Sequence, residues 1–212
     1  MQIAVLLYDR FTALDAIGPY EVLSRLPGAE LVFVAEQPGP VAADTGMLAL
    51  SAGAIGDVPH PDIVLVPGGP GQEAQMDDGP VHEWLRTADA ASSWTTSVCT
   101  GSLILAAAGV LAGRRATSHW LALERLREFG ARPTVARVVI DGKYVTAAGV
   151  SAGIDMALGL SARIAGTPTA QAIQLMMEYA PQPPLNAGTP FTAPPGLVSR
   201  MRMRSRHPQR VE

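Results

Sequence analysis

The only cysteine of the chain, Cys99, follows a short run at residues 94–98 and precedes a Thr-Gly-Ser sequence. A nucleophile on a sharp turn from strand to helix is held out of the sheet, beside unpaired backbone N–H groups. The small residues Gly101 and Ser102 let such a turn close tightly. A helix N-terminus stabilises a thiolate, so we expect the pKa of Cys99 to lie below its ordinary value of about 8.5. The pattern favours a nucleophile, and a buried structural cysteine is the alternative.

A glycine-rich sequence, Pro-Gly-Gly-Pro-Gly at residues 67–71, follows the apolar run at residues 63–66. Glycines permit close backbone approach and positive φ angles. The spacing does not match a dinucleotide-binding fingerprint, and no Lys-Ser/Thr pair follows as in a phosphate-binding loop. We therefore expect either a tight turn or a backbone N–H, that of Gly69, directed at Cys99 as an oxyanion donor.

A carboxylic acid, Asp15, follows the first apolar run and begins a segment with helical spacing. Aspartate at such a position is most often a helix N-cap. A carboxyl group at the same sheet edge as Cys99 can also act as a general acid or base. A nearby thiolate favours its protonated form, because two adjacent negative charges repel. The spacing alone leaves both roles open.

Histidine offers weaker candidates. His119 and Trp120 stand at another expected helix start, so a Cys–His pair competes with a capping or structural role for this histidine. The other three histidines lie among proline and polar residues and predict no metal site. A single cysteine also excludes an internal disulfide and most zinc sites.

The residues above must be positioned by strands and helices, and the sequence alternates between short runs typical of strands and segments with the spacing of helices. Short, partly β-branched runs at residues 2–8, 31–35, 63–66 and 94–98 predict strands, with segments of helical spacing between them. This alternation predicts an α/β fold with a parallel sheet covered on both faces, and ligands bind at the carboxyl ends of such strands. We expect helices at residues 15–26, 81–91, 102–111, 119–129, 151–165 and 169–179, and a hairpin around Asp141-Gly142 as an appendage to the main sheet.

Composition places the chain among globular proteins. It has 212 residues, 48% hydrophobic and 17% charged, which supplies a core and excludes an intrinsically disordered protein. The net charge of −3, without a basic stripe in the body, argues against nucleic acid as the main partner. The first apolar run lacks a preceding basic region and is far too short to cross a membrane. We expect a soluble, cytoplasmic protein.

The composition changes after residue 180. Six prolines between residues 180 and 196 exclude a helix or a central strand there and predict an extended segment lying over the body. Five arginines follow between residues 200 and 212, which we interpret as a solvated tail rather than a nucleic-acid-binding arm. We thus expect one domain at residues 1–180 and a Pro-rich extension with an Arg-rich tail at residues 181–212.

Four stretches together resemble the ThiJ/PfpI superfamily, whose members are cysteine-dependent and share a glutaminase-like, flavodoxin-type αβα sandwich. They are LLYDRFTALDAIGPYEVL, DIVLVPGGPG, TSVCTGSLILAAAGVLAGRRATSHW and AAGVSAGIDMAL, in this order along the chain. Within the superfamily the resemblance is strongest to the isonitrile hydratases. It depends on Asp15 rather than Glu, on Thr100 after Cys99, and on the sequence EYAPQPPLNAGTP.

The resemblance implies roles for the residues singled out above. Cys99 is expected to be the nucleophile, Asp15 the acid and base, and the N–H groups of Gly69 and Thr100 the oxyanion donors. The implied reaction adds water to a small isonitrile, R–N≡C, and gives an N-substituted formamide through a thioimidate on Cys99. This chemistry needs no metal or organic cofactor, and relatives in the superfamily imply a homodimer. His119 and Trp120 are expected to line the pocket.

Other functions known in the superfamily remain as alternatives. Glyoxalases and deglycases generally carry Glu at the acid position, and the protease-like members carry His after the cysteine. This chain has Asp15 and Thr100 there. AraC-type regulators contain a similar ligand-sensing domain, and the end of the chain at Glu212 leaves no room for their helix-turn-helix pair. A glutaminase would need a downstream His-x-Glu, which this sequence lacks.

Overall fold

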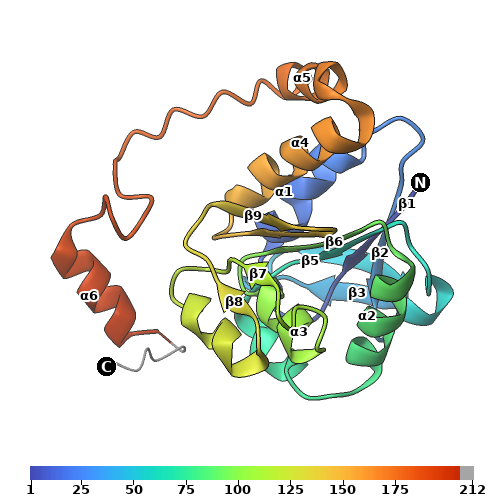
Figure 1. The fold of residues 1–212 in the computed structure, drawn as a ribbon, viewed down its shortest axis with the longest axis horizontal. Helices are drawn as coiled ribbons and strands as arrows, with labels where there is room; N and C mark the ends of the chain where they lie inside the picture. The colour runs from blue at the N-terminus through green and yellow to red at the C-terminus, as the bar shows by residue number, and fades with distance from the viewer. Residues whose placement is uncertain (206–212) are drawn as a thin grey trace.

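The computed structural model describes residues 1–205 and has an α/β fold built on an eight-stranded sheet (Figure 1). The strand order is β3-β4-β2-β1-β5-β6-β10-β9. The strands are β1 (Gln2–Leu6), β2 (Glu30–Ala35), β3 (Gly39–Ala42), β4 (Ala49–Ala54), β5 (Ile63–Val66), β6 (Trp94–Val98), β9 (Val138–Asp141) and β10 (Tyr144–Ala147).

The centre of the sheet is parallel. β1 pairs with β2 and β5, and β6 pairs with β5 and β10, all in parallel register. Every residue of β5 is buried, which explains its continuous apolar sequence. Because these strands point the same way, the carboxyl ends of β1, β5 and β6 meet at one edge of the sheet. The segments that follow them carry Asp15, Gly69 and Cys99.

Helices cover both faces of the sheet, as Figure 1 shows. On one face lie α1 (Ala13–Leu23), α4 (Ala152–Ala165) and α5 (Thr167–Met176), and on the other lie α2 (Pro80–Ala91) and α3 (Gly101–Ala107). The predicted three-layer αβα sandwich is therefore confirmed. Shorter elements are the 3₁₀ helices η1 (Ile55–Asp57), η2 (Pro70–Gln75) and η3 (Leu123–Phe129), and the pair of strands β7 (Arg115–Ala116) and β8 (Arg132–Pro133).

Two expectations about the elements need correction, and one pair of strands is absent from the sequence-based prediction. The hairpin around Asp141-Gly142 is not an appendage, because its second strand, β10, pairs with β6 inside the main sheet. The segment 119–129 contains only the 3₁₀ helix η3, and not an α-helix. The antiparallel pair β3 and β4 was not predicted, since its Gly- and Ala-rich sequence has low strand propensity.

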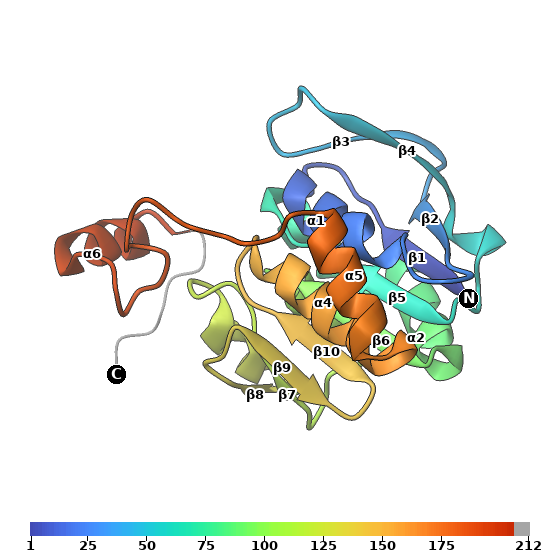
Figure 2. The ribbon, with the colours of Figure 1, turned by 90° about the horizontal axis from the view of Figure 1, so that it is seen from above.

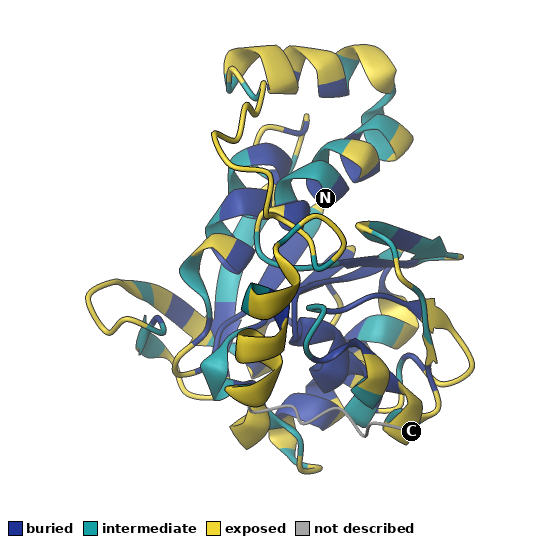
Figure 3. Cartoon of the chain, turned by 90° about the vertical axis from the view of Figure 1, so that its left-hand side faces the viewer, coloured by how far each residue is buried: buried dark blue, intermediate teal, exposed yellow. Residues whose placement is uncertain are grey.

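The C-terminal arm, residues 180–205, leaves the body after α5 (Figure 2). Residues 180–194 form no helix or strand, as the prolines predict. Most of the segment is exposed (Figure 3), and its residues 188–191 lie against the body. The first arginines of the expected tail belong to a helix, α6 (Pro195–Met203), while residues 206–212 lie outside the described residues. No helix within residues 1–205 is long and apolar enough to cross a membrane.

Candidate active site

Cys99 occupies a strained turn between β6 and α3. Its φ angle is +57°, in the left-handed region that residues with a Cβ adopt at an energetic cost. The turn needs Gly101, because a Cβ there would lie 2.1 Å from the carbonyl oxygen of Val66. Ser102 and Ser118 donate hydrogen bonds of 3.1 and 3.0 Å to the Cys99 carbonyl oxygen. The predicted sharp turn is confirmed, and it directs the thiol into a cavity.

Asp15 is fully buried in the first turn of α1, where Thr12 occupies the N-cap position. Of the two roles that the spacing leaves open for Asp15, the structure therefore excludes the capping role. Its Oδ2 accepts a hydrogen bond of 2.9 Å from the N–H of Gly68. Gly68 is also held through its carbonyl oxygen, which accepts a hydrogen bond of 2.8 Å from the N–H of Thr12. The glycine-rich loop thus positions the carboxyl group.

The buried Asp15 carboxyl and the Cys99 thiol interact electrostatically, so each group affects the pKa of the other. Burial raises the pKa of Asp15 from 3.8 to about 7. Burial and the adjacent carboxylate also raise the pKa of Cys99, although the N–H groups of Thr100 and Val150 oppose this by donating to the sulfur. The expected low pKa of Cys99 is thus wrong, because desolvation and Asp15 outweigh the helix N-terminus.

Alkylation tests this electrostatic arrangement. We expect the rate of Cys99 alkylation by iodoacetamide to rise with pH in the wild type to a midpoint above that of an ordinary thiol. Asp15→Asn removes the neighbouring negative charge, so the midpoint should fall in that variant. A wild-type midpoint at or below the ordinary value of about 8.5 would show that the thiol is activated before substrate binds.

The predicted oxyanion donors differ in their surroundings. The Thr100 N–H faces the sulfur of Cys99. The Gly69 N–H donates instead to the hydroxyl oxygen of Thr100, at 3.1 Å. Gly69 has a φ angle of +143°, and a Cβ at this position would lie 2.5 Å from the Thr12 nitrogen. Only glycine therefore fits at this position. The Val150 N–H is a further donor to the sulfur that the sequence alone did not single out.

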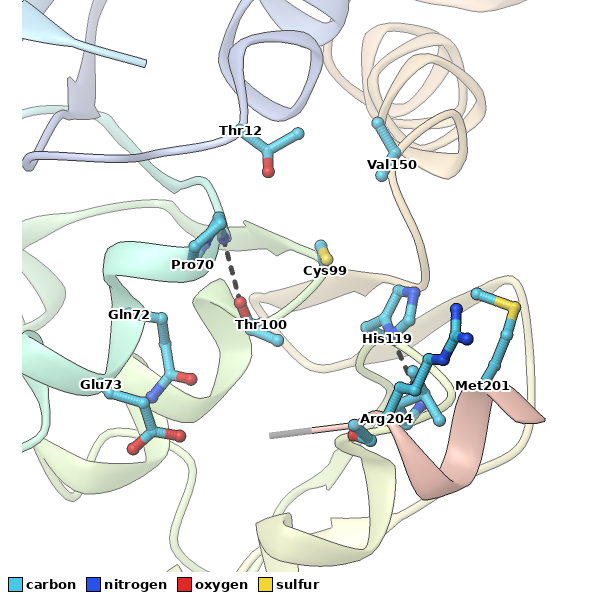
Figure 4. Close-up of a pocket in the computed structure, with 13 residues that line it drawn as sticks. Thr12, Pro70, Gln72, Glu73, Cys99, Thr100, His119, Val150, Met201 and Arg204 are labelled. Carbon is cyan, nitrogen blue, oxygen red and sulfur yellow. Dashed lines mark hydrogen bonds between the residues drawn. The ribbon is translucent and has the colours of Figure 1, made fainter. Parts of the chain in front are cut away.

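A cavity of about 450 Å³ opens at Cys99 and Thr100 (Figure 4). Gln72 and Glu73 of η2 stand on one side of it, and His119 and Arg204 on the other. The C-terminal arm supplies Met201, Arg204 and Ser205 to this wall. The arm therefore forms part of the wall of the cavity that contains the cysteine, and no pattern in the sequence connects it with residues a hundred positions earlier.

His119 and Val150 also line a second cavity of about 570 Å³. Trp120 lies only in this second cavity, which the arm closes with residues 188–191. Of the two expected pocket residues, His119 thus lines both cavities, and Trp120 lines the second but not the cavity of Cys99. Nδ1 of His119 accepts a hydrogen bond of 3.3 Å from the N–H of Leu121. Within residues 1–205 there is no group of three or more His, Cys, Asp or Glu side chains that could hold a metal ion.

Comparison with known proteins agrees with this geometry. The DJ-1/PfpI family matches residues 1–163, which include the strained turn at Cys99, the glycine-rich loop and Asp15. The chain belongs to the DJ-1/PfpI family. An isonitrile hydratase of Pseudomonas putida is 42% identical over 205 residues, covering 97% of this chain and 90% of the relative.

Two further relatives show the range of the family. A solved ThiJ/PfpI family protein from Pseudomonas syringae superposes with a TM-score of 0.91 at 41% identity, covering 94% of this chain and 84% of the other. The HTH-type transcriptional regulator CdhR of Pseudomonas aeruginosa is 37% identical over 157 residues. That alignment covers 72% of this chain but only 46% of the regulator. The family fold therefore occurs both in a named hydratase and in a regulator.

Proposed function

We propose that this protein is a cofactor-independent isonitrile hydratase. The observation that carries the proposal is the buried Asp15 carboxyl beside the thiol of Cys99, which lines a cavity at the carboxyl ends of the strands. The near full-length similarity to the P. putida isonitrile hydratase supports the choice of substrate class. Cys99 acts as the nucleophile and Asp15 as the general base and acid.

In the first half of the reaction, the Asp15 carboxylate removes the thiol proton as the sulfur attacks the terminal carbon of R–N≡C. A carbon–sulfur bond forms, and the electron pair left on the carbon takes the proton back from Asp15. The product is a thioimidate, Cys99–S–CH=N–R. A pKa of about 7 suits a group that must accept and return one proton near neutral pH.

In the second half, ionised Asp15 removes a proton from water while the water oxygen adds to the thioimidate carbon. Asp15 passes this proton to the nitrogen, giving a tetrahedral adduct that bears a hydroxyl group, an N–H and the sulfur. The carbon–sulfur bond then breaks, the hydroxyl proton passes to the sulfur, and R–NH–CHO leaves. Covalent attachment divides one difficult hydration into two easier steps.

The N–H groups of Thr100 and Gly69 stabilise negative charge that develops in these steps. For Gly69 this requires the Thr100 hydroxyl to turn away, because that hydroxyl oxygen now accepts the Gly69 hydrogen bond. His119 and Trp120 shape the space around the substituent R. We also infer a cytoplasmic location, where reducing conditions keep the Cys99 thiol free.

The function is tested by incubating the purified protein with p-tolyl isocyanide and measuring N-p-tolylformamide by mass spectrometry. We expect formamide to accumulate with the wild-type protein. Methylglyoxal serves as the comparison substrate, because some members of this superfamily are glyoxalases. Consumption of methylglyoxal without any formamide from a panel of isonitriles would contradict the proposal.

We further propose that the protein is a homodimer, as its resemblance to the superfamily implies. Large apolar side chains on α5 and the arm are exposed, among them Leu175 at 78% and Phe191 at 79%. Such side chains are typical of surfaces that a second copy covers. Sedimentation equilibrium should give a mass of about 44 kDa, twice the 22.2 kDa of the chain, and a monomer mass would contradict this proposal.

A further inference from the structure

Gln72 is a buried polar residue for which the fold supplies no partner. Its side chain lines the cavity of Cys99, and the residue is only 1% exposed. Its Nε2 has no hydrogen-bond partner within residues 1–205. The adjacent Glu73 differs, because its carboxylate forms an ion pair with Arg125. Figure 4 shows Gln72 on the side of the cavity opposite His119 and Arg204.

The backbone at Gln72 is held independently of its side chain. The backbone N–H of Gln72 donates to the Gly69 carbonyl oxygen at 3.1 Å. The N–H of Gly71 donates to the carbonyl oxygen of Arg10 at the same distance. A Cβ on Gly71 would lie 1.8 Å from the Asp9 carbonyl oxygen, so the loop is closely packed there. The fold therefore does not need the side-chain amide, and burying an amide without a partner is unfavourable. A ligand that forms hydrogen bonds with the Gln72 amide would explain why this amide is buried beside the cavity.

We propose that the Gln72 amide binds the tetrahedral adduct and the formamide of the reaction proposed above, on which this inference rests. A primary amide presents N–H donors at one end and a carbonyl acceptor at the other, and rotation about its last torsion exchanges the two. The isonitrile has neither an N–H nor an oxygen. The adduct and R–NH–CHO have both, so they match the amide and the substrate does not.

This difference determines the kinetic effect. A group that stabilises only a step after thioimidate formation raises kcat and leaves kcat/KM nearly unchanged, because kcat/KM depends only on the steps up to formation of the thioimidate. It acts on the second half of the reaction, after the thioimidate has formed. Gln72→Leu removes both polar ends while keeping a side chain of similar volume in the same place.

The test compares the wild type with Gln72→Leu and with Gln75→Leu, a control in the same 3₁₀ helix whose side chain does not line the cavity. With p-tolyl isocyanide, Gln72→Leu should lower kcat by about 10- to 100-fold and lower KM with it, so that kcat/KM stays within about twofold of the wild type. The thioimidate should accumulate on Cys99, as a protein mass increased by one isonitrile. The melting temperature should stay the same or rise, because a buried unpaired amide has been removed.

Other outcomes overturn the inference. A kcat within about twofold of an active wild type shows that the amide does not contact the adduct, and leaves the proposed function intact. A lower melting temperature together with a lower kcat shows that the amide supports the fold. If the wild-type protein produces no formamide, that result contradicts both the proposed function and this inference. Equal losses in Gln72→Leu and Gln75→Leu show that η2 as a whole is disturbed.

Discussion

Cys99→Ala should abolish formamide production while the protein remains folded. The thiol supplies the sulfur of the thioimidate, and alanine has no atom that can form this bond. The substitution keeps a Cβ at the position whose φ angle is +57°, so the demand on the backbone is unchanged. Steady-state turnover of p-tolyl isocyanide and the melting temperature, measured on the same preparation, check both parts of the prediction.

Ser97→Ala is the matched control for this substitution. Ser97 is also buried and lies on the same strand, β6, and its hydroxyl has no hydrogen-bond partner among the described residues. We expect Ser97→Ala to retain turnover. If Cys99→Ala also retained turnover, catalysis could not pass through a covalent adduct, and Asp15 would have to activate water directly.

Asp15→Asn should lower kcat by at least about 10²-fold, the lower end of contributions from general acid–base catalysis. Asparagine keeps an oxygen that can accept the hydrogen bond from the Gly68 N–H, and it cannot exchange a proton. Both halves of the reaction lose their proton carrier. Initial rates over a range of pH check this, and the rise in wild-type rate near pH 7 should disappear from the profile of the variant.

The same substitution should make the protein more stable above neutral pH. Burial raises the pKa of Asp15, so the folded state holds a proton between about pH 4 and 7 that the unfolded state releases. Stability associated with this group is therefore lost as pH rises. A change from 3.8 to about 7 corresponds to roughly 4 kcal/mol, of which Asp15→Asn should recover a part at pH 8 and almost none at pH 4.

Thermal unfolding at these two pH values separates a catalytic from a structural carboxyl group. A variant that is less stable at pH 8 and loses less than about fivefold in rate would assign Asp15 a structural role. A variant that is more stable and nearly inactive supports the proposed role. This combination is typical of buried groups that serve chemistry at the expense of stability.

The parts of the site predicted from the sequence are those that depend on local backbone rules. A lone cysteine between a strand and a small-residue helix start predicts the turn at Cys99, and the structure has that turn with a positive φ angle. The apolar strands β1 and β5 predict a parallel sheet, and a parallel sheet brings the segments after them to one edge. Asp15 and Cys99 meet for that reason, although 84 residues separate them.

The parts that were missed depend on distances between segments far apart in the chain. Whether the pKa of Cys99 rises or falls is a competition between its helix N-terminus and its burial beside Asp15, and burial prevails. The N–H of Gly68 donates to the Asp15 carboxyl, and that of Gly69 donates to the Thr100 hydroxyl, because of peptide orientations that composition does not specify. The arm closes the cavity through Met201 and Arg204, and no periodicity in an Arg-rich sequence predicts such a contact.

A single-turnover experiment tests the covalent mechanism most directly. Enzyme in excess over p-tolyl isocyanide is quenched in acid at successive times, and the intact protein and the formamide are both measured by mass spectrometry. We predict a transient protein mass increased by one isonitrile, located on the peptide that contains Cys99, which decays as formamide appears. Formamide formed with the same time course by Cys99→Ala, and with no adduct, would contradict the mechanism.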